Sequence, residues 1–202
     1  SGGSATESGS QSVTLTIEEN ESAPTVTLST SATSIDENSG SVLTLTATLS
    51  VATTADVTVT IGTSGTATEG TDYTDGSGNI DDLVITAGNT TETISFKPTD
   101  DSVYEGDETA TISIDSVSGG EASENGTQAV TITINENESA PTVTLSVSAS
   151  SIAENSGSTL TITATSSIVA DENITVGIST SGTATEGTDY GTISDITITA
   201  GN

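Results

Sequence analysis

The stretch Leu43–Leu49, LTLTATL, has an apolar residue at every second position and threonine between them. Side chains alternate between the two faces of a β-strand, so this pattern predicts a strand with one apolar and one polar face. Six further segments also have apolar residues at every second position, at 26–28, 57–61, 83–85, 94–96, 110–114 and 130–134. No segment has helical spacing. We therefore expect an all-β fold of about seven strands, with two antiparallel sheets packed face to face.

One connection between these strands has a clear turn signal. Ala87-Gly88-Asn89 separates the segments 83–85 and 94–96. Glycine and asparagine adopt the backbone conformations that tight turns need. This spacing predicts a β-hairpin in which the two segments pair with each other.

The chain contains an internal repeat of about 117 residues. Residues 1–24 and 118–141 are identical at 17 of 24 positions, and the same shift places TVTLS at Thr25 onto Thr142 and TSGTATEGTDY at Thr63 onto Thr180. We expect residues 1–22 to be the C-terminal strand of a preceding repeat. Residues 23–138, the first unit, are expected to be a complete repeat. Residues 139–202, the second unit, are expected to be the N-terminal half of a following one.

Composition limits the possible functions. The 202 residues carry 29 Asp and Glu against a single Lys or Arg, for a formal net charge of −28. Such a chain repels nucleic acids and anionic membranes, so we expect neither as a partner. It has no histidine and no cysteine, which excludes disulfides and the commonest transition-metal ligands. No apolar segment is long enough to span a membrane. Hydrophobic residues make up only 31%, but their regular alternation favours folded β-structure over disorder.

The acidic residues are most concentrated at Pro98–Glu108, PTDDSVYEGDE, where five of eleven residues are carboxylates. Lys97 is the only cation in the sequence. Crowded carboxylates repel one another unless a counterion neutralises them, and calcium accepts several oxygen ligands in a flexible geometry. In a sandwich, loops separated by two strands emerge at the same end. The acidic loops near Glu37, Asp72 and Asp100–Glu108, together with the exit at Glu136–Glu138, are therefore expected to converge on a Ca²⁺ site.

These motifs resemble the Calx-β family, a family of calcium-binding, immunoglobulin-like β-sandwiches. The resemblance rests on IDENSG at 35–40, GTATEGTDY at 65–73, DDSVYEGDE at 100–108, and a final strand that ends in Glu136-Asn137-Glu138 before Ala140-Pro141. It covers the first unit and recurs in the second. The resemblance implies tandem immunoglobulin-like sandwiches with calcium as the cofactor.

The resemblance also implies a set of metal ligands. In the first unit, the matching positions are Glu37, Asp72, Asp100, Asp101, Glu105 and Glu108, with Val103 offering a backbone carbonyl and Glu136 and Glu138 at the exit. The two exit residues depart from the family pattern, which usually has Asp there. In the second unit, Glu154 and Asp189 correspond to Glu37 and Asp72, but the equivalent of the 100–108 block is missing, so we expect an incomplete site. Glu19 and Glu21 would be exit ligands of the preceding repeat.

The sequence favours a structural role over catalysis. We expect a calcium-binding repeat of a long extracellular or cell-surface bacterial protein, such as an adhesin extender, a matrix protein or a filament subunit. Calcium would stiffen its joints, and its partners would be neighbouring repeats of the same chain and other copies in a filament or matrix. An adhesive module that binds a ligand or glycan is one alternative, and a filament built by strand complementation between copies is another. No nucleophile–base pair or phosphate-binding loop is present, so we expect no enzyme activity.

Overall fold

The structure is a computed structural model that describes residues 2–18 and 20–202. In the first unit, the strands form two five-stranded sheets with the orders β10-β1-β3-β7-β5 and β2-β11-β9-β4-β6. The elements are β1 (Thr25–Thr30), β2 (Ser34–Asp36), the 3-10 helix η1 (Glu37–Ser39), β3 (Leu43–Leu49), β4 (Val57–Gly65), β5 (Tyr73–Thr74), β6 (Leu83–Ile85), β7 (Thr91–Pro98), β8 (Val103–Tyr104), β9 (Glu108–Ser118), β10 (Ser123–Glu124) and β11 (Ala129–Asn135).

The seven segments predicted from alternation are all strands, β1, β3, β4, β6, β7, β9 and β11. Their alternate side chains face one another between the two sheets and form a continuous apolar core. Leu45, Val59 and Ile112 are fully buried at its centre, and the rings of Tyr73 and Phe96 stack there with centroids 4.7 Å apart. The predicted all-β sandwich is therefore confirmed.

The predicted hairpin between residues 83–85 and 94–96 is wrong. β6 pairs with β4 in one sheet, whereas β7 pairs with β3 and β5 in the other. The turn itself is present, since Gly88 has a φ of +86° and the Asn89 N–H donates to the Thr86 carbonyl at 3.0 Å. It carries the chain across from one sheet to the other. A turn signal predicts a change of direction, but the strand that becomes the partner is chosen by the packing of the whole sandwich.

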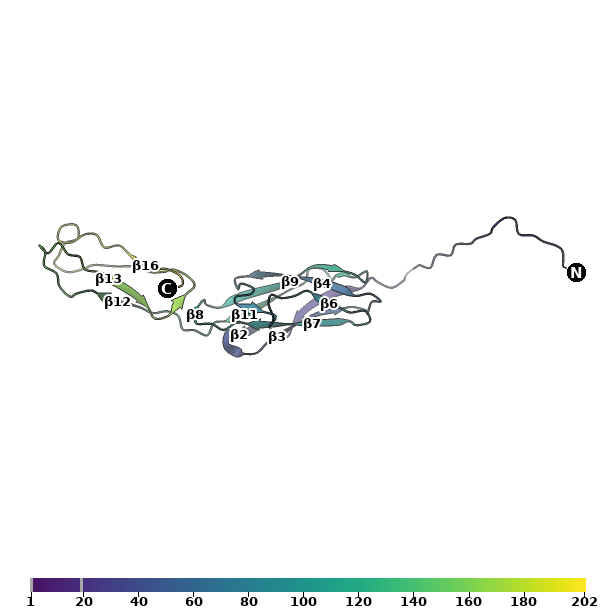
Figure 1. The fold of residues 1–202 in the computed structure, drawn as a ribbon, viewed down its shortest axis with the longest axis horizontal. Helices are drawn as coiled ribbons and strands as arrows, with labels where there is room; N and C mark the ends of the chain where they lie inside the picture. The colour runs from purple at the N-terminus through teal and green to yellow at the C-terminus, as the bar shows by residue number, and fades with distance from the viewer. Residues whose placement is uncertain (1, 19) are drawn as a thin grey trace.

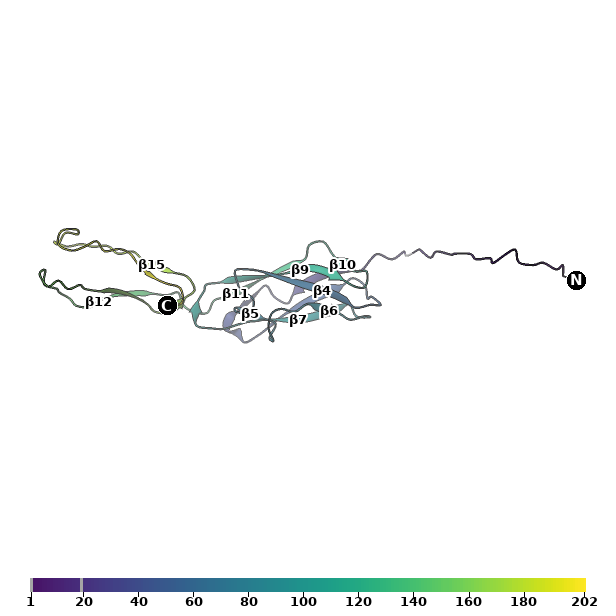
Figure 2. The same cartoon turned by 45° about the horizontal axis from the view of Figure 1, so that its top comes forward.

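The second unit is a smaller and more open structure. It has one ribbon of β12 (Val143–Val147) with β13 (Ile162–Ser166) and another of β15 (Ile174–Val176) with β16 (Ile196–Ile198). The two ribbons face each other, as Figure 2 shows, around an apolar cavity of about 360 Å³. Leu145 is 54% exposed there, whereas Leu28, which precedes it by 117 residues, is 7% exposed in the first unit. The apolar faces of the second unit are thus only partly covered.

The two units lie end to end, and a pair of short strands joins them. β14 (Val169–Ala170) of the second unit pairs in parallel with β8 of the first, with Val169 opposite Val103 and Ala170 opposite Tyr104. Figure 1 shows the second unit continuing beyond the end of the sandwich where β8 lies, while residues 2–18 extend away at the opposite end. Within the described part of the chain, no helix has the length and apolar character needed to cross a membrane.

Candidate metal site

The site lies at the end of the sandwich that faces the second unit. β2 pairs in parallel with β11, and this register places Asp36 opposite Asn135. The Asn135 side chain also donates a hydrogen bond to the Asp36 carboxylate at 2.7 Å. The residue that follows each strand is a glutamate, so Glu37 and Glu136 leave the sheet side by side. The pairing of two strands far apart in the sequence thus creates the first contact between acidic segments.

The loop between β7 and β9 approaches these glutamates with its backbone N–H groups. The N–H of Asp101 donates to Glu37 Oε1 at 3.1 Å. The N–H groups of Glu105 and Gly106 both donate to Glu136 Oε2, at 2.6 and 2.9 Å. Gly106 has a φ of +78°, a conformation that glycine adopts without strain. The acidic loop is therefore held in place by the carboxylates of the neighbouring strands.

Asp72 enters from the segment that follows β4. Its Oδ2 accepts a hydrogen bond from the Thr68 N–H at 2.5 Å, which closes a short turn. Its carbonyl accepts a hydrogen bond from the Thr99 N–H at 2.9 Å, which ties this segment to the start of the acidic loop. Asp72 is half-buried and lies beside Glu105 and Glu108. Four segments of the chain consequently meet at one end of the sandwich.

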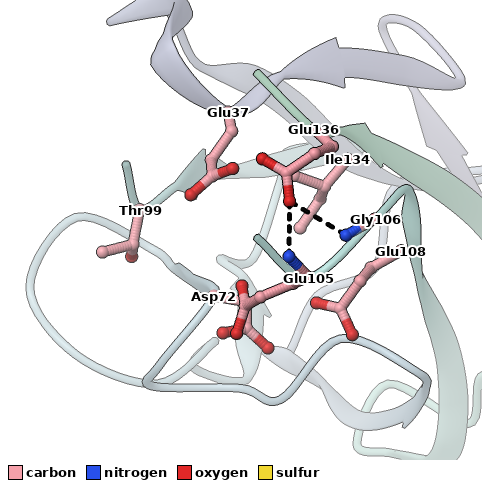
Figure 3. Close-up of a pocket in the computed structure, with 8 residues that line it drawn as sticks. All are labelled: Glu37, Asp72, Thr99, Glu105, Gly106, Glu108, Ile134 and Glu136. Carbon is pink, nitrogen blue, oxygen red and sulfur yellow. Dashed lines mark hydrogen bonds between the residues drawn. The ribbon is translucent and has the colours of Figure 1, made fainter. Parts of the chain in front are cut away.

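The carboxylates form three overlapping groups of three. In each group, one oxygen from every residue lies within 4.8 Å of the others. Glu37 belongs to two groups and Glu105 to two, so the groups share members and make one continuous acidic centre. A cavity of about 10 Å³ lies at this centre, and Figure 3 shows the five carboxylates that line it, which are those of Glu37, Asp72, Glu105, Glu108 and Glu136. The groups are Glu37–Glu136–Glu138, Glu37–Asp101–Glu105 and Asp72–Glu105–Glu108.

Mutual repulsion and burial change the protonation of this centre. Burial raises the pKa of Glu37 to about 7, and repulsion from Glu136, Glu138 and Asp101 adds to this increase. A hydrogen bond from the Asp101 N–H acts in the opposite direction and lowers the pKa in part. The pKa of Glu105 is raised to about 7 by burial and then by the charges of Asp72 and Asp101. That of Glu108 is also raised to about 7, by burial and by Asp72. Without a cation, these carboxyls therefore hold protons well above their usual range.

The two exit glutamates behave differently from each other. Burial alone would raise the pKa of Glu136, but hydrogen bonds from the N–H groups of Glu138, Glu105 and Gly106 outweigh it and lower this pKa to about 2. The pKa of Glu138 is raised, mainly by the adjacent Glu136. Glu138 Oε2 is buried and has no hydrogen-bond partner among the described residues. A buried carboxylate oxygen without a partner is costly, and this oxygen is available to a cation.

The remaining sequence-predicted residues occupy varied positions. Asp100 is exposed and lies outside the three groups, although its charge contributes to the raised pKa of Glu138. Val103 lies in β8, and its N–H donates to Asp101 Oδ1 at 2.7 Å. In the second unit, Glu154 and Asp189 are both exposed, and neither belongs to a carboxylate group of this kind within residues 2–18 and 20–202. Glu19 lies outside the described residues. The ligand roles of all these residues stay predictions.

Sequence reasoning missed one acidic residue, Asp171 of the second unit. Its N–H donates to the carbonyl of Tyr104, the residue before Glu105, at 3.3 Å, and its charge contributes to the raised pKa values of Glu105 and Glu108. Its side chain is exposed and lies outside the three groups. A comparison of the two repeat copies contains a signal for it. The residue 117 positions earlier is Thr54, so the acid is peculiar to the second unit.

The residues present fit a hard divalent cation. All the converging donors are carboxylate oxygens, which calcium prefers, and the chain has no histidine or cysteine to favour a softer metal. The cavity has about the volume that one water-sized occupant needs. The partnerless oxygen of Glu138 and the protons retained by Glu37, Glu105 and Glu108 both indicate a centre that lacks compensating positive charge.

Fold and site together define a β-sandwich domain with a cluster of carboxylates at its outgoing end. The family model of the Calx-beta domain matches residues 19–138 and again residues 136–198. The chain therefore belongs to the Calx-beta domain family. This is a family of calcium-binding domains and not of enzymes, so the expectation that the chain is not an enzyme is confirmed.

Several solved structures are similar to this chain. The apo form of the Calx CBD1 domain has 21% identity and a TM-score of 0.46, and the match covers 56% of this chain and 99% of that one. CBD12 from CALX1.2 has 23% identity and a TM-score of 0.42, with 50% and 40% of the two chains covered. The calcium binding domain CBD12 of CALX1.1 has 24% identity and a TM-score of 0.41, with 50% and 41% covered. No curated protein matches the chain.

Proposed function

We propose that the chain is a structural calcium-binding repeat of a long extracellular protein, in which calcium rigidifies the joint between consecutive units. The observation that carries this proposal is the position of the acidic centre. Glu136 and Glu138 belong both to the carboxylate groups and to the segment that leads into the second unit. A cation held there would connect the end of the sandwich to its own exit.

In this proposal, the carboxylates would bind the ion and backbone N–H groups would position them. Glu37, Asp72, Asp101, Glu105, Glu108, Glu136 and Glu138 would hold the ion, since these are the members of the three groups. Bound calcium supplies positive charge and several coordination positions for oxygen. The backbone N–H groups of Glu105 and Gly106 hold Glu136 in place beforehand. Neutralising the centre would remove the repulsion that otherwise loosens the 99–108 loop and the exit.

The setting proposed for this repeat is a bacterial surface or secreted protein, such as an adhesin extender, a matrix protein or a filament subunit. The strongly acidic, cysteine-free composition supports it, and so does the abundance of free calcium outside cells. The partners proposed are neighbouring repeats. The end-to-end arrangement of the two units supports a role as a spacer.

Thermal unfolding with calcium and with a chelator tests the proposal. Binding to the folded state alone stabilises it by RT ln(1 + [L]/Kd), which is about 4 kcal/mol at a thousandfold excess of calcium over Kd. We expect calcium to raise the melting temperature and, in small-angle scattering, to narrow the distribution of particle lengths. Magnesium at the same concentration is the control for general screening of charge. An unchanged melting temperature and unchanged scattering on chelation would overturn the proposal.

A second candidate function is assembly of copies by strand complementation. The alternating residues Val13, Leu15 and Ile17 are 94%, 84% and 89% exposed, whereas Ile132 and Ile134, 117 positions after Leu15 and Ile17, are buried in β11. The open apolar cavity of the second unit is a surface that such a segment can cover. Light scattering over a range of protein concentrations tests this candidate, and a constant monomeric mass would exclude it.

A further inference from the structure

The acidic loop of the first unit is in backbone contact with the second unit. β8, at Val103–Tyr104, pairs in parallel with β14, at Val169–Ala170. The Asp171 N–H extends this pairing by donating to the Tyr104 carbonyl at 3.3 Å. Ala170 is buried at the joint, and its carbonyl accepts a hydrogen bond from the Gly201 N–H at 2.9 Å. The position of Asp171 relative to the loop is therefore fixed by the strand pairing.

The charge of Asp171 acts on the acidic centre across the joint. Repulsion from Asp171 contributes to the raised pKa values of both Glu105 and Glu108. Glu172, the next residue along the chain, is not among the main contributors to either shift. The two adjacent acids thus differ in their relationship to the site. The backbone of Asp171 is bonded to Tyr104, the residue before Glu105, although its side chain is exposed and lies outside the three groups. Glu172 provides a natural comparison.

Asp171 has no evident structural task in its own loop. Within the described residues, its carboxylate accepts no hydrogen bond, whereas the nearby Asn173 Oδ1 accepts one from the Ala200 N–H at 2.8 Å. The equivalent of Asn173 in the first unit, Asp56, makes the matching bond to the Ala87 N–H at 2.8 Å. The equivalent of Asp171 is Thr54, so this loop forms without an acid at that position.

We propose that Asp171 is a further calcium ligand for the site of the preceding unit, either directly or through a bridging water, so that the second unit completes the site. This inference rests on the proposed calcium binding by the first unit. The ligand set then comes from two consecutive repeats. Loss of an outer partner that orients a metal's ligands typically lowers metal affinity 10- to 100-fold, and we expect loss of a carboxylate that binds the ion itself, or its bound water, to cost at least the lower of these values.

Calcium titration calorimetry on the full 202-residue chain tests this inference with four variants. Asp171→Asn removes the charge, and Asp171→Thr installs the residue found at the equivalent position of the first unit. Glu172→Gln is the matched control, since it removes an equal charge one residue away. Glu37→Gln reports on the main site. We expect both Asp171 variants to weaken calcium binding about tenfold or more, Glu172→Gln to change it less than twofold, and Glu37→Gln to weaken it most.

Melting curves without calcium provide a second, independent readout. Removing the charge of Asp171 removes repulsion toward Glu105 and Glu108, so we expect the calcium-free protein to melt at the same temperature or higher. If the Asp171 variants bind calcium more weakly but melt without calcium at an unchanged or higher temperature, they have lost a ligand and not their fold. A lower calcium-free melting temperature in both Asp171 variants would instead assign the residue a structural role and overturn the inference.

The outcomes distinguish this inference from the proposed function. If the unmodified chain binds calcium but the Asp171 variants match Glu172→Gln, the ligand role of Asp171 is excluded and the proposed function stands. If the unmodified chain binds no calcium, both are overturned.

Discussion

Glu136 Oε2 accepts a hydrogen bond from the Glu105 N–H at 2.6 Å, which ties the exit of the sandwich to the loop before β9. The bond joins residues 31 positions apart, and it places one carboxylate beside the backbone of another acidic residue. It also helps to keep Glu136 ionised, since its pKa is lowered to about 2. The acidic centre thus has one member whose pKa is lowered and three, Glu37, Glu105 and Glu108, whose pKa values are raised to about 7. This division leads to the first two predictions.

Glu37→Gln should affect stability in opposite directions with and without calcium. Glu37 is 6% exposed, and its raised pKa shows that its charged form is unfavourable in the folded protein without a cation. At pH 7.5, we expect the variant to melt at a higher temperature in chelator and to lose most of the calcium-dependent increase. Calorimetric melting in both conditions measures this. Glu172→Gln, which removes a charge at an exposed position of the second unit, is the control and should change neither value appreciably.

The calcium-free protein should become less stable as pH rises through the pKa values of its buried carboxyls. Glu37, Glu105 and Glu108 have folded-state pKa values of about 7, above their ordinary value of 4.5. Between about pH 4.5 and 7, the folded state therefore binds more protons than the unfolded state, and stability falls as pH increases. Glu136, with its low pKa, stays ionised throughout this range. Chemical denaturation at pH 5.0, 6.0, 7.0 and 8.0 measures the trend.

Calcium should reverse this trend. Protons compete with the cation for the same oxygens, so we expect calcium affinity to increase between about pH 6 and 8. With saturating calcium, the free energy of unfolding should then be flat or rise over that interval. A calcium-free protein whose stability rises from pH 5 to pH 8 would contradict the assigned pKa directions.

Gly65→Ala should be far more destabilising than Gly182→Ala. Both glycines occupy the same motif, with φ angles of +131° and +132°. A Cβ at Gly65 would lie 2.0 Å from the Thr109 carbonyl oxygen, whereas nothing lies within 4 Å of one at Gly182. The backbone strain is shared, so the difference isolates the clash with β9. We expect Gly65→Ala to lower the free energy of unfolding of the first unit by about 2–4 kcal/mol. Equal losses in the two variants would contradict this account.

Phe96→Ala should destabilise the first unit without abolishing its site chemistry. Phe96 is fully buried and stacks on Tyr73, which lies next to Asp72 in the chain. Loss of a buried phenylalanine typically costs about 3–5 kcal/mol. In denaturant melts we expect a loss of this size both with calcium and with chelator. Val84→Ala, at a position that is 41% exposed in the same sandwich, is the control and should cost little.

The strands could be predicted from the sequence where apolar residues recur at every second position. The seven segments that became the principal strands each carry a clear period of two, and the apolar face of each is buried. The short strands β2, β5, β8 and β10 were not predicted, because none of them has two apolar residues at alternate positions. Two of them matter for the site. β2 brings Glu37 beside Glu136, and β8 connects the acidic loop to the second unit.

The convergence of acidic loops could be anticipated from the number of strands between them. The environment of each carboxylate could not, because it depends on which backbone N–H groups face it. Glu136 receives several such donors and Glu138 Oε2 receives none, although the two residues are of the same type and two positions apart. Asp171 could not be predicted as a neighbour of the acidic loop, because this proximity comes from the pairing of β8 with β14 between the units. No sequence pattern within its own loop indicates such a contact.

The pairing of β8 with β14 has a thermodynamic consequence for the proposed site. If docking of the second unit raises calcium affinity by some factor, calcium must strengthen docking by the same factor, since the two equilibria form a closed cycle. Calcium bound at a joint would then favour docking of the next unit, and a docked unit would favour calcium binding at that joint. A joint whose incoming unit has threonine in place of Asp171 would have weaker coupling. In a series of such repeats, each joint would therefore have its own calcium affinity and stiffness. The residue at the position of Asp171 would decide which joints stay flexible.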